Sequence, residues 1–336
     1  MLISSTPLRI SLGGGGTDLP FYYKNYGSFV LAAAIKKHVY ITVSNHFEKI
    51  IKLNYSQTEM CNSPNEIKHP IIREALDIVG IKNHVEINSI ADLPAKSGLG
   101  SSGSFTVGLL NALYTHLGKT ITRKELAETA CHIEMDLLKE PVGKQDQYIA
   151  AFGGFSCINI NKQGKVHVVP LRISNESIQD LEHNLTYFYT GVMRSASDVL
   201  KDQKKTSKRN HNVFESLTRI KEIGLKIKKC LEKDDLDEFG RLMDEHWMEK
   251  KKTSGKISNN IFDEYYDLAK QCGALGGKII GAGGGGFFMF YTNTREKRKK
   301  LRNEFIKRGL NEVRMPFESE GTKIILNLEG RRNEHN

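Results

Sequence analysis

The chain has few cysteines, and none of them falls in a pattern that holds a metal or a disulfide framework. Five cysteines are spread over 336 residues, with no Cys-x-x-Cys pair and no histidine at metal-ligand spacing. Disulfide-stapled domains and zinc modules place their cysteines at short, repeated intervals. We therefore expect neither a disulfide framework nor a zinc site.

Long apolar runs are also missing. No segment approaches the roughly 20 apolar residues of a membrane span. The N-terminus has no basic stretch followed by an apolar stretch and a small-residue cleavage site, so it does not resemble a secretory signal. A hydrophobic fraction of 39% with only eight prolines is typical of a soluble globular protein. These features predict a cytoplasmic protein with no membrane partner.

Acidic residues are too few to balance the basic ones, and the formal net charge is +10. Such an excess is compatible with nucleic-acid binding. However, Lys and Arg concentrate in 194–256 and 295–309, on helical patterns with acidic residues between them. Solvated helix surfaces account for most of that charge, and a site for two polyanions would also favour a positive field. We expect no nucleic-acid partner.

Glycine, in contrast, is abundant and clustered. The stretch from Leu93 to Ser104 holds three glycines and four hydroxyl side chains, and an apolar-periodic run from Phe105 to Leu117 follows. Backbone N–H groups of such a loop can converge on an anion at the helix N-terminus, which makes the stretch a candidate phosphate cradle. It contains neither the Walker A ending nor a Gly-x-Gly-x-x-Gly order. Taken alone, it is equally compatible with a flexible loop and a hydroxyl N-cap.

One acidic side chain lies where the pattern calls for an apolar residue. Thr122 and Glu125 form a capping box for a helix predicted over 123–138. In that helix Glu134 falls within the apolar stripe rather than opposite it. A lone carboxylate there is costly unless a cation or hydrogen-bond donors meet it.

Two further charged residues lie beside glycine turns. Residues 2–12 alternate as a half-buried strand, which points Arg9 away from the core near the first glycine cluster, 13–16. Asp146 follows Gly143 at a junction between a loop and a helix. Its residue type favours a helix N-cap over a catalytic carboxylate.

The order of elements predicts an α+β protein with two domains, 1–170 and 171–336. The first half mixes strands and helices, and the second half is rich in helices. Strands are expected at 2–12, 29–35, 39–43, 50–55, 85–89, 185–190, 278–280, 287–291, 311–316 and 322–328, with a strand pair in 154–169. Helices are expected at 70–79, 105–117, 123–138, 208–232, 235–252, 258–271 and 295–307, with a helical turn reaching Ala151.

Three glycine-rich motifs in this order resemble those of the GHMP kinase superfamily. They are Pro7–Asp18, the Pro-x-x-x-Gly-Leu-Gly-Ser-Ser motif Pro94–Ser102, and Gly281–Phe287. The resemblance covers nearly the whole chain. It implies an N-terminal ATP-binding domain like domain 2 of ribosomal protein S5 and a C-terminal ferredoxin-like α/β domain with added helices. Within the superfamily, Thr-Asp-Leu-Pro after the four glycines and the segment 143–147 are most similar to heptose 7-phosphate kinases, with bacterial fucokinases as neighbours.

The resemblance implies an ATP- and Mg²⁺-dependent kinase. It would phosphorylate the anomeric hydroxyl of D-glycero-D-manno-heptose 7-phosphate, and the 1,7-bisphosphate would feed a nucleotide-activated heptose for a surface polysaccharide. The alternatives are a fucokinase- or galactokinase-like kinase of a free sugar, and a non-catalytic sensor or RNA-binding protein. Gln145 stands where galactokinases carry a hydrophobic residue, which argues against galactose. The oligomeric state stays open, with a homodimer as one candidate.

The resemblance also implies residue roles. Asp146 would be the catalytic carboxylate, and Arg9 would either stabilise charge on the transferring phosphoryl group or hold that aspartate ionised. Ser102 and Glu134 would hold the metal, and Arg194 or Lys96 would bind the distal phosphate of the acceptor. The ATP phosphates would lie against Lys96, Ser97, Gly98, Leu99, Gly100, Ser101, Ser102 and Gly103. The sugar would contact Gly14, Gly15, Gly16, Thr17, Asp18, Asp146, Arg194, Gly284 and Gly285.

Overall fold

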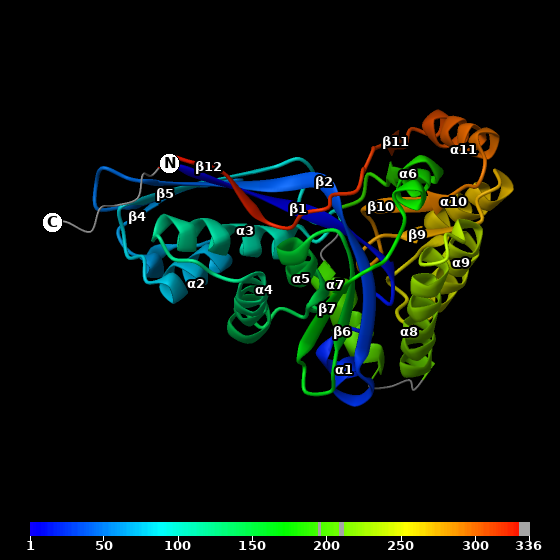
Figure 1. Cartoon of the computed structure of the whole chain (residues 1–336), viewed down its shortest axis with the longest axis horizontal. Helices are drawn as coiled ribbons and strands as arrows, with labels where there is room; N and C mark the ends of the chain where they lie inside the picture. The colour runs from blue at the N-terminus through cyan, green and yellow to red at the C-terminus, as the bar shows by residue number, and fades with distance from the viewer. Residues whose placement is uncertain (194–195, 208–211, 329–336) are drawn as a thin grey trace.

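The larger of two sheets is organised around two long antiparallel strands, β1 (Leu2–Gly13) and β2 (Ser28–Asn45) (Figure 1). The computed structural model describes residues 1–193, 196–207 and 212–328. The strand order is β12-β1-β2-β5-β3-β4, and β6 and β7 extend from the first part of β2. The other strands of this sheet are β3 (Ile51–Asn54), β4 (Thr58–Cys61), β5 (Val85–Ala91), β6 (Phe155–Ile160), β7 (Val166–Pro170) and β12 (Lys323–Asn327).

The strand β2 is continuous, although the sequence predicted two separate strands at 29–35 and 39–43. Its first part pairs with β6 and its last part pairs with β5. The seven apolar residues from Phe29 to Ile35 are all buried, which fits a strand covered on both faces. Strand β4 was missed because its four residues carry too short a pattern.

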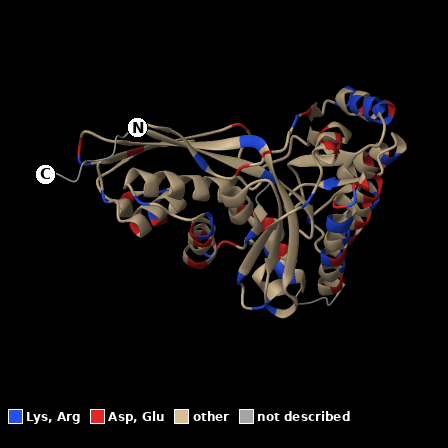
Figure 2. Cartoon of the chain, in the orientation of Figure 1, with Lys and Arg blue, Asp and Glu red and all other residues tan. Residues whose placement is uncertain are grey.

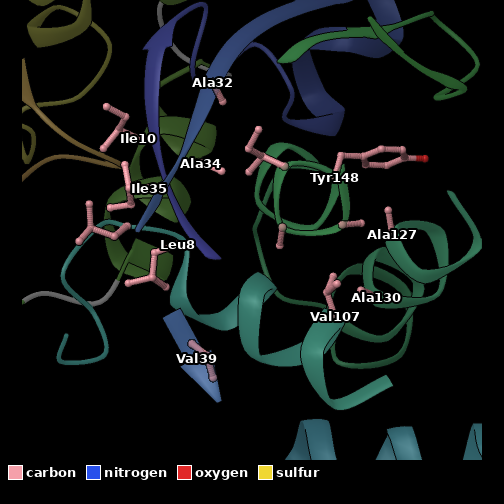
Figure 3. Close-up of a cluster of buried hydrophobic side chains, with 14 of the residues drawn as sticks. Leu8, Ile10, Ala32, Ala34, Ile35, Val39, Val107, Ala127, Ala130 and Tyr148 are labelled. Atoms are coloured by element: carbon pink, nitrogen blue, oxygen red, sulfur yellow. The ribbon is translucent and has the colours of Figure 1, made fainter. Parts of the chain in front are cut away.

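Four helices cover one face of this sheet (Figure 1). Small residues on the strands and helices, such as Ala32 and Ala130, let the two layers approach closely, and Tyr148 fills the space between α4 and α5 (Figure 3). Helix α3 begins at Ser101, four residues before the prediction, because the loop itself forms its first turn. The helices are α2 (Pro70–Val79), α3 (Ser101–His116), α4 (Arg123–Cys131) and α5 (Gln145–Phe152), with short α1 (Pro20–Tyr26) and η1 (Pro64–Glu66) outside this layer.

The predicted helix 123–138 is not regular throughout. The capping box of Thr122 and Glu125 is present, and α4 ends at Cys131. A π-helical segment, η2 (His132–Leu137), continues it. Such segments change the direction in which side chains point and are frequent at functional sites.

The second sheet has the order β11-β8-β10-β9 and carries the remaining helices (Figure 1). Basic and acidic residues gather on the outer helices of this half, α8, α9 and α11 (Figure 2). Helix α6 was not predicted, and the strand expected at 311–316 is reduced to two residues. The bounds are α6 (Asn175–Asn184), β8 (Leu185–Tyr189), α7 (Ala196–Ser207), α8 (Asn212–Leu231), α9 (Leu236–Lys251), α10 (Asn260–Gln271), β9 (Gly276–Ile279), β10 (Phe287–Tyr291), α11 (Arg295–Lys307) and β11 (Asn311–Glu312).

The end of the chain returns to the first sheet. Strand β12 pairs with β1, so a division of the chain at residue 170 does not separate the two sheets. The amide of Leu328 donates to the carbonyl of Met1 at 2.9 Å, which places the last described residue beside the first. Among the described helices, none is both long and apolar enough to cross a bilayer.

Candidate active site

Two of the glycine loops pack against each other at the N-terminus of α3. Gly98 has a φ of +81°, and a Cβ there would lie 2.7 Å from the carbonyl oxygen of Ile280. Gly286 likewise approaches Ser97, where a Cβ would lie 2.2 Å from the carbonyl oxygen. Only glycine fits such contacts without moving backbone. The third loop therefore packs directly against the candidate phosphate cradle.

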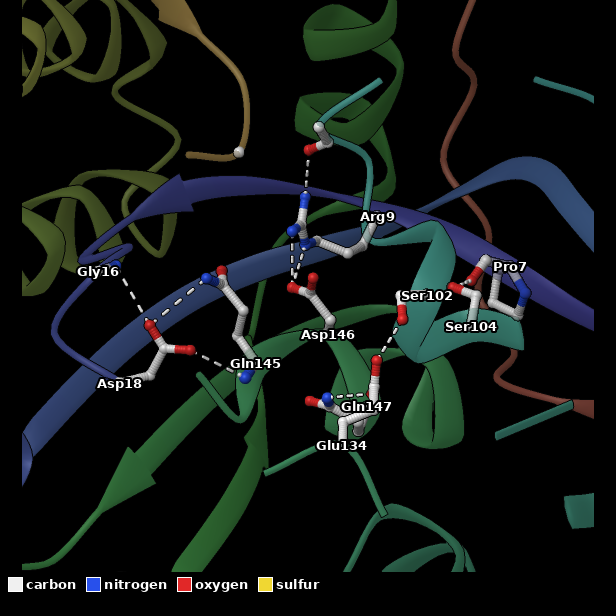
Figure 4. Close-up of polar contacts among 12 residues, drawn as sticks. Pro7, Arg9, Gly16, Asp18, Ser102, Ser104, Glu134, Gln145, Asp146 and Gln147 are labelled. Atoms are coloured by element: carbon white, nitrogen blue, oxygen red, sulfur yellow. Dashed lines mark hydrogen bonds and ion pairs between the residues drawn. The ribbon is translucent and has the colours of Figure 1, made fainter. Parts of the chain in front are cut away.

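Arg9 links this cradle to Asp146 (Figure 4). Its Nε and Nη2 lie 2.7 and 2.6 Å from Oδ1 of Asp146, and its Nη1 donates to the carbonyl oxygen of Gly98 at 2.7 Å. Arg9 is buried, and its backbone amide donates to the carbonyl of Leu99. The two charged residues singled out in the sequence thus form an ion pair directly beside the cradle.

Asp146 is not a helix N-cap, although its residue type favoured that interpretation. Lys144 holds the N-cap position of α5 without a side-chain cap, and Asp146 lies in the first helical turn. A Cβ on Gly103 would lie 2.8 Å from the Asp146 Cβ, so α3 and α5 meet closely at this point. The side chain is therefore free to serve the pocket rather than its own helix.

Glu134 is buried in η2 and points toward the start of α3 (Figure 4). Its carboxylate accepts hydrogen bonds from the Ser102 hydroxyl and the Gln147 amide. Burial raises the pKa of Glu134 to about 7, against the lowering effect of those two donors. Partners of this carboxylate in the described part of the chain are neutral, so the charged form lacks a countercharge.

The chemistry of this pair fits magnesium. A hydroxyl and a carboxylate are hard oxygen donors, and Mg²⁺ accepts one or two protein oxygens while it keeps several waters. A cation beside Glu134 would supply the countercharge that the site lacks. No larger group of histidine, cysteine or acidic side chains is placed to hold a metal within the described ranges.

Asp18 is held at the N-terminus of α5 (Figure 4). Its Oδ2 accepts from the Gln145 amide nitrogen at 3.0 Å, and its Oδ1 accepts from the Gly16 amide at 3.2 Å and from the Gln145 side chain at 3.4 Å. Burial raises the pKa of Asp18. A Cβ on Gly143 would lie 2.0 Å from Oδ2, so this contact requires glycine there.

A pocket opens between the Arg9–Asp146 pair and the second sheet with its helices. Its walls include Gly15, Gly16 and Asp18 of the first glycine loop. Gly281 and Ala282 of the third loop complete that side. The structure thus brings the predicted residues Gly15, Gly16 and Asp18 together with Asp146.

Other predicted residues have different surroundings. Thr17 is buried, and its hydroxyl bonds to the carbonyl of Gly14 and to Ser28, so it faces the loop interior. Gly284 donates its amide to Ile257 rather than lining the pocket. Gly14 and Gly285 also lie outside the pocket lining, with close approaches to Phe29 and Val192.

The structure describes only one of the two candidates for the distal phosphate. Lys96 is exposed on the cradle loop and does not line the pocket. Arg194 lies outside the described residues. Within the cradle, Ser97 and Leu99 are buried, while Gly100 and Ser101 are half-buried at the helix start.

The sequence analysis missed several residues that line the pocket beside the first glycine loop. They are Ser11, Gln203, His246, Lys250 and Lys278. Lys278 could have been identified from the sequence, because it interrupts an apolar strand just before the third glycine cluster. No local pattern distinguishes His246 and Lys250, because lysine-rich helical sequence surrounds them.

Comparison with known proteins agrees with this geometry. Residues 66–154 match the GHMP kinases N terminal domain and residues 227–311 match the GHMP kinases C terminal domain. The chain is 31% identical to a D-glycero-alpha-D-manno-heptose 7-phosphate kinase of Campylobacter jejuni, over 90% of this chain and 93% of that protein. The chain belongs to the GHMP kinase family. The family resemblance seen in the motifs is confirmed, and the protein is an ATP-dependent sugar kinase.

Solved structures of GHMP kinases share the fold. A D-glycero-D-manno-heptose 1-phosphate kinase from Bacteroides thetaiotaomicron superposes with a TM-score of 0.80 at 25% identity, over 97% of this chain and 99% of that one. A putative sugar kinase from Campylobacter jejuni gives a TM-score of 0.78 at 29% identity, over 96% and 97%. The predicted α+β two-domain GHMP kinase fold is therefore confirmed.

Proposed function

We propose that this GHMP kinase transfers the γ-phosphate of ATP to the anomeric hydroxyl of D-glycero-D-manno-heptose 7-phosphate. The product is the 1,7-bisphosphate. The observation that carries the proposal is the Arg9–Asp146 ion pair, which lines the pocket and is bonded to Gly98 of the glycine cradle. The similarity to a heptose 7-phosphate kinase supports the choice of acceptor.

The nucleotide phosphates lie at the N-terminus of α3 in this proposal. Backbone amides from Gly98 to Gly103 present partial positive charge there. Ser102 and Glu134 are the side chains that would hold Mg²⁺, which neutralises charge on the phosphates during transfer. The buried Glu134 carboxylate is kept in place by the Gln147 amide.

Asp146 orients the attacking hydroxyl and accepts its proton. Phosphoryl transfer asks the protein mainly for in-line positioning and charge neutralisation, so one carboxylate at the junction of the two sites suffices. Arg9 pairs with this carboxylate and fixes it relative to Gly98 of the cradle. Asp18 and the glycines beside it approach the sugar hydroxyls.

The test is the steady-state rate of ADP formation with heptose 7-phosphate for Asp146→Asn. The variant keeps the shape but cannot accept a proton, so we expect kcat to fall by about 10²- to 10⁴-fold. The control is Asp136→Asn, an exposed residue paired with His132 on η2, which should keep its rate. An Asp146→Asn variant with an undiminished rate would refute the proposal.

The acceptor is tested separately. The wild-type protein is assayed with fucose, galactose, mannose 6-phosphate and heptose 7-phosphate, and the product is examined by phosphorus NMR. We expect the highest kcat/KM with heptose 7-phosphate and a second phosphate ester on the anomeric carbon. A preference for a free sugar would reject the proposed acceptor and retain the kinase.

A further inference from the structure

Three buried basic side chains line the pocket together. They are His246 and Lys250 on α9 and Lys278 on β9, and we call them the basic wall. Their exposed fractions are 1%, 9% and 2%. Cationic residues are rarely buried to this extent unless an anion meets them.

Neither lysine has an acidic partner among the described residues. The Nζ of Lys250 donates to the carbonyl oxygens of Ile279 at 3.1 Å and of Gly281 at 2.5 Å. The Nζ of Lys278 donates to the carbonyl oxygen of Leu12 at 3.1 Å. An ammonium group offers three donors, so these neutral contacts leave donors on both lysines for a ligand. Burial, and the nearby Arg9, lower the pKa of both lysines, that of Lys250 to about 7.

His246 is a second, independent sign that the pocket binds a ligand. Both of its ring nitrogens are buried and have no hydrogen-bond partner among the described residues. The Ser11 hydroxyl, which also lines the pocket, is likewise unpartnered there. Buried polar atoms are nearly always satisfied, so these groups indicate a ligand that the pocket is built to receive.

We propose that the basic wall binds the phosphate group that the acceptor sugar already carries. The inference rests on the proposed function and adds to it the residues that recognise a phosphorylated acceptor. A phosphate monoester brings close to two negative charges and several acceptor oxygens, which match two ammonium groups and an imidazole. This phosphate is thus assigned a set of contacts other than Arg194 and Lys96.

The position of the wall favours the acceptor over the nucleotide. The same pocket is lined by Asp18 and Gly16, whereas the proposed metal ligands Ser102 and Glu134 are absent from its lining. Figure 4 shows Arg9 and Asp146 between Asp18 on one side and Ser102 on the other. One phosphate at the cradle and another at the basic wall therefore flank the catalytic carboxylate.

The test compares Lys250→Met and His246→Asn with wild type, using heptose 7-phosphate and the same heptose without its phosphate. We expect kcat/KM for the sugar phosphate to fall by about 10²-fold, because each variant loses a hydrogen bond to the charged phosphate. The loss should be at least tenfold smaller with the free heptose. The matched control is Lys252→Met, which changes an exposed lysine at the end of α9 that pairs with Glu249.

Equal losses with both sugars would overturn the inference and leave the kinase assignment standing. That result would mean that the lysine serves the transferred phosphoryl group or only supports the third loop. A second readout is independent of turnover: the shift in melting temperature caused by mannose 6-phosphate with a non-hydrolysable ATP analogue present. Stabilisation of wild type that is lost in Lys250→Met supports the inference even if the proposed acceptor is wrong, and an unchanged shift rejects it.

Discussion

At the scale of single residues, the site is built from charges that the fold buries without complete compensation. Glu134 has only neutral donors, and Asp18 is held by amides. Arg9 has a full partner in Asp146, but the basic wall has none among the described acidic residues. Unpaired buried charge destabilises a protein by itself and is relieved by a ligand of opposite sign. The substrates therefore contribute to the stability of the site that binds them.

Glu134 makes the stability of the folded protein depend on pH. Its pKa rises from 4.5 to about 7 on burial, so the folded protein binds a proton more tightly than the unfolded chain does. The resulting stability is fully present below pH 4.5 and is lost as the pH rises through 7. Glu134→Gln is neutral at every pH and should be more stable than wild type at pH 8, by up to about 3 kcal/mol, but not at pH 4.5.

Urea unfolding at the two pH values measures the effect. The Gln147 amide can adapt to the substitution, because its Oε1 is buried without a partner among the described residues. The exposed Asp136→Asn serves as the control and should differ from wild type by less than about 0.5 kcal/mol. Mg²⁺ added at pH 8 should raise the melting temperature of wild type more than that of Glu134→Gln. A variant that is less stable than wild type at pH 8 contradicts the interpretation.

Some residues of the site could be predicted from the sequence and others could not. Glu134 could be singled out because a carboxylate within an apolar stripe breaks a helical pattern, and Arg9 because a strand alternates. Lys250 and His246 could not, since a basic residue in a lysine-rich helix is locally ordinary and only the packing of α9 buries it. For Asp146 the residue type favoured an N-cap, because an aspartate at a junction between a loop and a helix commonly caps that helix.

At the scale of elements, the glycine loops act as packed surfaces rather than as flexible segments. Gly98 and Gly281 each leave room for the other's backbone, and a Cβ on Gly281 would lie 2.4 Å from the Gly98 carbonyl oxygen. The sequence showed three separate clusters. Their contact depends on β9 and β10 bringing the third loop behind the cradle, which no local pattern encodes.

Gly98→Ala tests this arrangement. The new Cβ would lie 2.7 Å from the Ile280 carbonyl oxygen in a backbone with φ +81°, so one loop must move. We expect kcat/KM for ATP to fall by at least about tenfold, a loss of roughly 1.4 kcal/mol in transition-state binding. Initial rates at varied ATP and saturating acceptor measure it.

The control for that variant is Gly118→Ala. Gly118 has a similar φ of +69°, but nothing lies within 4 Å of its Cβ position. It shares the conformational cost and lacks the steric conflict, so it should lose stability while keeping its KM for ATP. Equal changes in the two variants would mean that backbone strain alone explains the Gly98 result.

At the scale of the whole molecule, the two sheets share one hydrophobic cluster. Residues of β10 alternate between two hydrophobic clusters: Phe287, Met289 and Tyr291 belong to the cluster shared with the first sheet. Phe288 and Phe290 belong to a second cluster, which includes Trp247. The sequence predicted both halves but placed a boundary at residue 170, because neither the return of β12 nor the shared cluster leaves a local signal.

This continuity predicts cooperative unfolding. Trp247 is the single tryptophan, and it is fully buried in the second cluster. Gly108 lies on α3, where a Cβ would be 2.5 Å from the Thr6 hydroxyl of β1 in the first sheet. Gly108→Ala should therefore weaken the first sheet directly, by about 1–3 kcal/mol. If β10 couples the two clusters, Trp247 fluorescence and far-UV circular dichroism should show the same lowered urea midpoint. A fluorescence midpoint that stays at the wild-type value while the dichroism shifts would show that the two sheets unfold independently.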